Sequence, residues 1–119
     1  MHVPVNKTFG NIKALYTTYE NPKIAVAAYN AEGTQLALLV DDEGRYEKLT
    51  INVADQYGEL PRNHIAVKNY SEGEGLAVAL ENAGFGTIIT DNQHIGFGTF
   101  SILELSFDAE KIYQDSRFA

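Results

Sequence analysis

Alternating apolar and polar positions mark several segments of the chain as β-strands with one buried face. The alternation is cleanest in 46–53, where Leu49, Ile51 and Val53 are predicted to face inward and Thr50 outward. Further segments rich in β-branched, aromatic and aliphatic residues also predict strands, because turn residues bound them. These segments are 12–19, 23–29, 35–40, 64–68, 87–90 and 99–107.

One segment, 69–85, predicts a helix with a recognisable start and end. Apolar residues recur at i, i+4 and i+7 from Leu76, which places them on one face of a helix. Ser71 and Glu74 have the spacing of a capping box, in which each side chain accepts a hydrogen bond from the other residue's backbone. Gly84 is placed to end the helix in the left-handed conformation.

The start of this helix also contains two glycines, Gly73 and Gly75. Each glycine destabilises a helix interior by about 1 kcal/mol relative to alanine. The helix therefore needs tertiary packing, and we expect it to pack on one face of the sheet.

A second, shorter helix is predicted at the end of the chain. Asp108 is a suitable N-cap, and Phe107 and Ile112 occupy the two positions of a hydrophobic staple around it. Runs of strands with few helices indicate an α+β fold. We expect a single domain over 1–119, with a mostly antiparallel sheet of about five to seven strands, one capped helix on one face and this short C-terminal helix.

Two polar segments interrupt the predicted strands. The segment 54–63 predicts a loop and 91–94 a polar turn. Loops carry functional residues more often than strands do. Tyr57 and His94 are therefore candidates for a small ligand-binding or enzymatic site, and Asp91 and His94 for an acid–base pair.

Composition limits the chemistry that the chain can perform. The sequence contains no cysteine, which excludes disulfides, thiolate metal sites and cysteine nucleophiles. Its three histidines lack metal-ligand spacing, and no Gly-x-Ser-x-Gly motif is present. We expect no catalytic, cofactor-binding or metal-binding residue. With no signal-peptide pattern and no apolar run long enough to cross a bilayer, we expect a cytoplasmic protein without membrane contacts.

The net charge of −7 is unevenly distributed. The first 40 residues hold three lysines and two glutamates, a balance of +1, so the remainder carries −8. Direct nucleic-acid binding is disfavoured, because its affinity comes mainly from basic contacts to phosphate. The acidic residues either keep the protein soluble, or form a face for a basic protein, or imitate a polyanion.

Two acidic segments and an excess of tyrosine point to protein binding. The chain has seven tyrosines, and tyrosine is favoured at interfaces because it combines a large apolar area with a polar tip. A tyrosine-bearing sheet face beside acidic loops would suit a protein partner. The candidate interaction residues are Asp41, Asp42, Glu43, Tyr70, Glu72 and Glu74.

The segments 49–53 and 63–76, which read Leu-Thr-Ile-Asn-Val and Asn-His-Ile-Ala-Val-Lys-Asn-Tyr-Ser-Glu-Gly-Glu-Gly-Leu, resemble a small bacterial family. The family is catalogued as domain of unknown function 4313. The resemblance spans roughly 24–105 and is most specific over 68–75, although Gly73 replaces an expected Asn.

The resemblance implies an origin in plasmids, conjugative elements or phages, and it assigns no activity. It leaves two further functions open. One is a non-enzymatic accessory protein, monomer or homodimer, that acts through an unidentified protein partner. The other is an acidic inhibitor of a host defence nuclease, of the anti-restriction or anti-CRISPR type.

Overall fold

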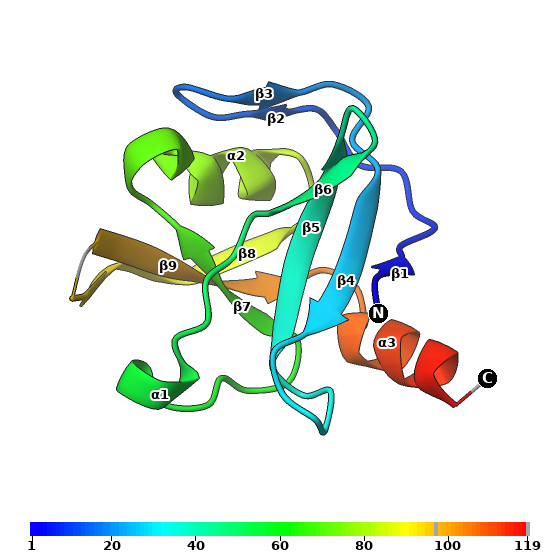
Figure 1. Cartoon of the computed structure of the whole chain (residues 1–119). Coiled ribbons are helices and arrows are strands. Elements are labelled where there is room, and N and C mark those ends of the chain that lie inside the picture. The colour runs from blue at the N-terminus through cyan, green and yellow to red at the C-terminus, as the bar shows by residue number, and fades with distance from the viewer. Residues whose placement is uncertain (97, 119) are drawn as a thin grey trace.

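The computed structural model describes residues 1–96 and 98–118, with the side chains of Glu72 and Ile95 excepted. The chain has an α+β fold in which all strand pairs are antiparallel (Figure 1). The strands are β1 Val3–Pro4, β2 Ile12–Lys13, β3 Thr18–Tyr19, β4 Ile24–Ala28, β5 Leu36–Asp42, β6 Arg45–Lys48, β7 His64–Lys68, β8 Gly86–Ile95 and β9 Gly98–Leu105. The helices are α1 Ala54–Tyr57, the 3-10 helix η1 Ser71–Gly73, α2 Leu76–Asn82 and α3 Ala109–Arg117.

The strands are divided among three small sheets, whereas the sequence predicted one larger sheet. Their orders are β1-β4-β5-β6, β2-β3 and β7-β9-β8. A short segment after β6 joins the first and third sheets. Leu49 N–H donates to Leu38 O in β5 at 2.8 Å, and Ile51 N–H donates to Ala66 O in β7 at 3.0 Å. The two sheets therefore form one strongly bent layer.

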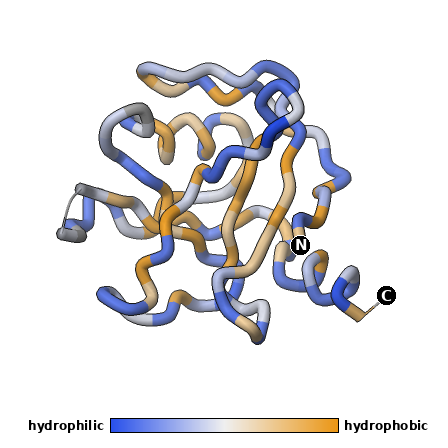
Figure 2. Tube along the Cα trace, in the orientation of Figure 1, coloured by the Kyte–Doolittle hydropathy of each residue, from blue (hydrophilic) through white to orange (hydrophobic). Residues whose placement is uncertain are grey.

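Helix α2 lies inside this bend, and the β2–β3 hairpin covers it from the other side (Figure 1). The hydropathy colouring places apolar residues along β4 and β5 and on α2 (Figure 2). The main core takes side chains from both larger sheets, from α2 and from the hairpin, where Ile12 is fully buried. The prediction that the helix needs tertiary packing on a sheet face is confirmed.

The start of α2 differs from the predicted capping box. Ser71 has a φ of 55° and belongs to η1, and α2 begins only after Gly75, which has a φ of 79° and supplies no side-chain cap. Gly75 interrupts the helix with a left-handed residue, and Gly73 allows the chain to pass close to the β7 backbone. A Cβ on Gly73 would lie 2.9 Å from Lys68 O.

The end of α2 is as predicted. Gly84 has a φ of 92°, its N–H donates to Glu81 O at 3.1 Å, and Phe85 N–H donates to Leu80 O at 3.0 Å. This pair of bonds is a Schellman motif. Phe85 is fully buried in the main core together with Leu80.

The expected strand over 12–19 is wrong. The chain reverses within it, and Ile12–Lys13 pairs with Thr18–Tyr19 around a turn closed by a bond from Ala14 N–H to Thr17 O of 2.9 Å. The turn contains no Gly, Pro, Asn or Asp, the residues that usually mark a turn in sequence.

The region from 46 to 63 is partly as predicted. Leu49 and Val53 are buried, but Thr50 is buried too, against the expected outward position. Its hydroxyl accepts a hydrogen bond from Leu38 N–H and lies 2.9 Å from the Tyr29 hydroxyl. The predicted loop 54–63 begins with the short helix α1.

The predicted polar turn at 91–94 is also wrong, because β8 continues through it to Ile95. The pairing of β8 with β9 shifts register between Ile88 and Thr90 and again between Thr90 and Gln93. These irregularities are β-bulges, which absorb extra residues without ending a strand.

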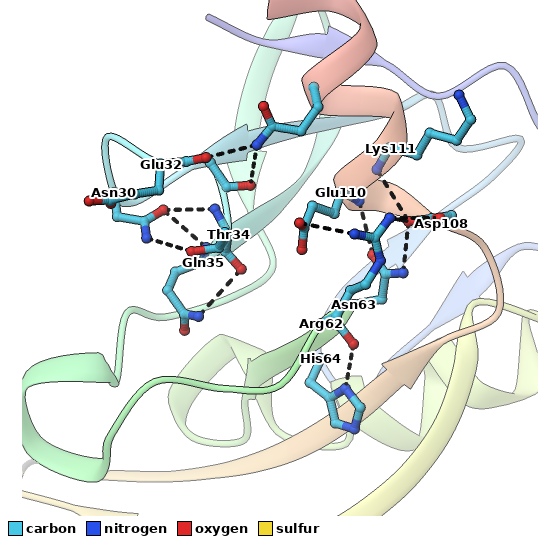
Figure 3. Close-up of polar contacts among 12 residues, drawn as sticks. Asn30, Glu32, Thr34, Gln35, Arg62, Asn63, His64, Asp108, Glu110 and Lys111 are labelled. Carbon is cyan, nitrogen blue, oxygen red and sulfur yellow. Dashed lines mark hydrogen bonds and ion pairs between the residues drawn. The ribbon is translucent and has the colours of Figure 1, made fainter.

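The cap of α3 is confirmed. Asp108 accepts a hydrogen bond from Lys111 N–H at 3.2 Å (Figure 3). Phe107 is buried, and the partly buried Ile112 packs against the same core, as the staple requires.

Candidate interaction surface

The β2–β3 hairpin presents two consecutive large side chains to solvent. Leu15 is 64% exposed and Tyr16 is 68% exposed, and both lie in the turn between the strands. Sequence reasoning missed them, because a continuous strand over 12–19 would have buried every second residue. No turn residue in the sequence marks their position.

The hairpin is held at both ends. At the tip, Leu15 N–H donates to Glu74 O at 3.3 Å, just before the start of α2. At the base, the Tyr19 hydroxyl donates to Glu47 Oε2 of β6 at 2.9 Å. The exposed pair is therefore displayed on a fixed support.

Helix α2 extends this exposed area. A Cβ on Gly75 would lie 3.6 Å from Leu15 N, so the hairpin tip touches the beginning of the helix. Val78, three residues further on, is 51% exposed. Residues three apart on a helix are surface neighbours. We call Leu15, Tyr16, Glu74 and Val78 the hairpin–helix surface.

Of the predicted interaction residues, only Glu74 is placed by the structure on this surface, with an exposed side chain. Glu72 belongs to η1, and its side chain lies outside the described part of the chain. Tyr70 is half-buried, and a Cβ on Gly98 would lie 2.4 Å from its ring. The ring of Tyr70 thus packs on the β9 backbone and anchors the β7–η1 connection.

The other predicted residues form a second acidic turn, between β5 and β6. Glu43 and Gly44 have φ values of 54° and 86°, as in a two-residue type I′ hairpin. Asp42 and Glu43 are exposed, and Asp41 Oδ1 accepts a hydrogen bond from Gly44 N–H at 2.9 Å. The predicted residues therefore lie on two separate turns. The β2–β3 hairpin contacts the start of α2 near the turn that contains Glu74, and it contacts β6 near the turn that contains Asp42 and Glu43.

A polar cluster around the buried Ser101 explains part of the motif that carries the family resemblance. Asn69 Nδ2 donates to Ser101 Oγ, and Ser101 Oγ donates to Asp91 Oδ1. Ser101 is fully buried, and Asn92 N–H also donates to Asp91 Oδ1, at 3.0 Å. The Asp91 carboxylate is thus engaged within the bulge, where no hydrogen bond joins it to a described atom of His94.

Tyr57 and His94 do come together, as the ligand-site hypothesis requires. They line an open cleft of about 310 Å³ with Gln56 and Gly96. The Tyr57 ring meets Phe100 edge-on, with centroids 5.2 Å apart. His94 lies on β8, not in a turn.

Across the described residues, no group of three or more histidines, aspartates and glutamates is arranged to hold a metal ion. Within the same part of the chain, no helix is long and apolar enough to cross a membrane. Comparisons with protein-family models, with curated proteins and with solved structures found no match. The family resemblance therefore stays a prediction.

Proposed function

We propose that this protein acts by binding another protein through the hairpin–helix surface, without catalysing a reaction. The observation that carries the proposal is the exposure of Leu15 and Tyr16 on a hairpin fixed to Glu74. Large aromatic side chains are the residues that most often dominate interface energetics.

The fixed support favours this role. A segment whose backbone is already held in place loses less conformational entropy on binding, so more of the contact free energy appears as affinity. The hydrogen bonds of Leu15 and Tyr19 hold the hairpin at tip and base before any partner arrives.

Charge indicates the kind of partner. The protein carries −7 overall, and the exposed Glu74 borders the apolar pair. A partner with an apolar pocket for Tyr16 and basic residues around it would complement this surface. Together with the resemblance described above, this supports an accessory role in a bacterial mobile element.

A photo-crosslinking amino acid at position 16 tests the proposal in bacterial cells. We expect one dominant adduct from position 16 and none of the same mass from position 118, because Phe118 is even more exposed but lies at the far end of α3. The adduct should disappear with Leu15→Asp and weaken with Glu74→Lys, but persist with Glu59→Lys in the α1–β7 loop. Identical adducts from positions 16 and 118 would overturn the proposal. An adduct from position 16 that Leu15→Asp does not reduce would also overturn it.

The acidic-inhibitor hypothesis has less support from the charge pattern. Arg45 follows the acidic turn of Asp42 and Glu43 directly, and Glu47 and Lys48 lie at the other end of β6, so the signs alternate along this edge. A nucleic-acid mimic needs a continuous negative surface to displace DNA. Competition between DNA and this protein for the crosslinked partner would favour that hypothesis.

The cleft of Tyr57 and His94 favours a ligand-binding alternative. Its volume lies at the lower end of the range for small-molecule sites. Tyr57→Phe and His94→Ala should leave the position-16 adduct unchanged, because the two regions share no residue. Loss of the adduct in these variants would indicate that the cleft takes part in partner binding.

A further inference from the structure

A second cleft opens at the end of the four-stranded sheet, where β1 leaves the sheet and β4 begins. It has a volume of about 390 Å³. Val5 and Ile24, which are buried, are among the residues that line it. A small organic molecule fits a space of this size, which exceeds what a bare inorganic ion needs.

The walls of this cleft are preformed. Val5 N–H donates to Ile24 O at 2.9 Å, and Asp41 N–H donates to Lys23 O at 2.9 Å, so both wall segments are tied to the sheet. Pro4 and Pro22 stand in the walls, and proline fixes its own φ angle. The backbone around the cleft would therefore need little ordering when a ligand binds.

The rim consists of hydrogen-bond donors. Lys7, Lys23, Tyr46, Asn6 and Thr8 line the cleft, and none of its lining residues is acidic. Each of these side chains has at least one N–H or O–H group to offer. This is unusual for a chain in which acidic residues outnumber basic ones by 16 to 9.

The two lysines are available to a ligand. Neither Lys7 nor Lys23 forms an ion pair with a described residue, and both side chains are exposed. The Lys7 ammonium lies 5.9 Å from the Phe107 ring centroid. This cation–π contact is weak, and an ion pair with an anionic ligand can replace it. Asp41 lies opposite Tyr46 across the β5–β6 pair, but its carboxylate accepts from Gly44 N–H.

We propose that this cleft binds a small phosphate monoester. The phosphate would bind between Lys7 and Lys23, with the hydroxyl of Thr8 or Tyr46 as a further donor. The Tyr46 ring is held edge-on to His2 at a centroid distance of 5.2 Å, and it offers an apolar face to the organic part of the ligand.

The charge of the whole protein selects against longer anions. A net charge of −7 repels a polyanion that extends beyond the cleft. At physiological ionic strength, charges more than about 8 Å away are largely screened. The electrostatic attraction on a compact phosphate inside the cleft therefore comes mainly from the two lysines beside it.

Titration with adenosine monophosphate, followed by the backbone amide signals in two-dimensional NMR, tests the proposal. We expect saturable shifts at Asn6, Lys7, Thr8 and Lys23 at millimolar ligand, and no such shifts with adenosine, which lacks the phosphate. The double variant Lys7→Gln, Lys23→Gln should weaken binding about tenfold or more, since it removes both charges. Lys13→Gln, on the exposed side of β2, is the matched control and should bind like the parent protein.

Several results would overturn this proposal. One is the absence of shifts at the cleft with millimolar adenosine monophosphate, and another is equal shifts with adenosine. If Lys13→Gln weakened binding as much as the double variant does, the affinity for the nucleotide would depend only on the total charge of the protein. Tyr16→Ala should leave this titration unchanged, so the outcome is independent of the protein-binding proposal.

Discussion

Arg62 and Asp108, which lie 46 positions apart, are joined by one guanidinium nitrogen that reaches both carboxylate oxygens, Oδ1 at 2.8 Å and Oδ2 at 2.9 Å. A second guanidinium nitrogen, Nη1, donates to Glu110 Oε1 at 3.0 Å (Figure 3). Asn63 Nδ2 also donates to Asp108 Oδ1, at 2.9 Å. This network ties the entry of β7 to the first turn of α3.

The network makes stability depend on acid pH. Hydrogen bonds from Asn63 and Arg62 lower the pKa of Asp108 from 3.8 to about 2. Because the folded-state pKa is depressed, the carboxylate stabilises the fold above pH 4, and this contribution is lost as the pH falls from about 4 to about 2. The Asp108 side chain is 44% exposed, so solvent screening keeps the effect small.

Asp108→Asn should therefore flatten the dependence of stability on pH in this range. The free energy of unfolding, measured by urea denaturation between pH 2 and 5, should fall less steeply in the variant than in the parent protein. Asp55→Asn, an exposed position in α1, is the control and should retain the parent slope. An Asp108→Asn slope equal to that of the parent protein would contradict the network.

Ser101→Ala should destabilise the protein by about 1–3 kcal/mol, because it leaves the amide of Asn69 without its acceptor in a partly buried site. Chemical denaturation at neutral pH measures the loss. Ser106→Ala is the matched control, since its hydroxyl donates to Gly84 O at an exposed position. A loss no larger at Ser101 than at Ser106 would show that the hydrogen bonds of the buried Ser101 hydroxyl add no extra stability.

Gly98→Ala should act through Tyr70. The new methyl group would lie 2.4 Å from the Tyr70 ring and displace it, so we expect a loss of about 1–3 kcal/mol. In a Tyr70→Ala background, the same glycine substitution should cost much less, because the obstructing ring is gone. Additive losses in this double-mutant cycle would mean that the ring does not rest on Gly98.

Tyr29 should ionise at a higher pH than the ordinary pKa of a tyrosine hydroxyl. Burial raises the pKa of its hydroxyl above 10, although the hydrogen bond with Thr50 acts in the opposite direction. Since the folded-state pKa is raised, the fold loses stability as the pH rises through 10 towards this higher value. Ultraviolet titration of phenolate absorbance should show a late-titrating tyrosine that Tyr29→Phe removes, whereas Tyr57→Phe should leave it in place.

Local signals in the sequence predicted the elements whose ends depend on neighbouring residues alone. The strand 64–68 has the predicted bounds, and Gly84 and Asp108 end and begin their helices as expected. The α2 start was mispredicted, because Gly75 adopts a left-handed turn that the Ser71–Glu74 spacing could not reveal.

The candidate surface was harder to predict, since it depends on contacts between distant segments. The acidic residues were found, but their division between two turns follows from the tertiary arrangement. The exposure of Leu15 and Tyr16 depends on a chain reversal without turn residues, and on a bond to Glu74, 59 positions away along the sequence. Neither could be read from residue periodicity.

The segment that joins the two larger sheets has a consequence for unfolding. Leu49 and Ile51 donate their N–H groups to opposite sheets, so neither sheet can separate without breaking a bond made by this short connection. Both amides should therefore exchange with solvent deuterium only when the whole molecule opens. We therefore expect the β1-β4-β5-β6 and β7-β9-β8 sheets to unfold together rather than one after the other.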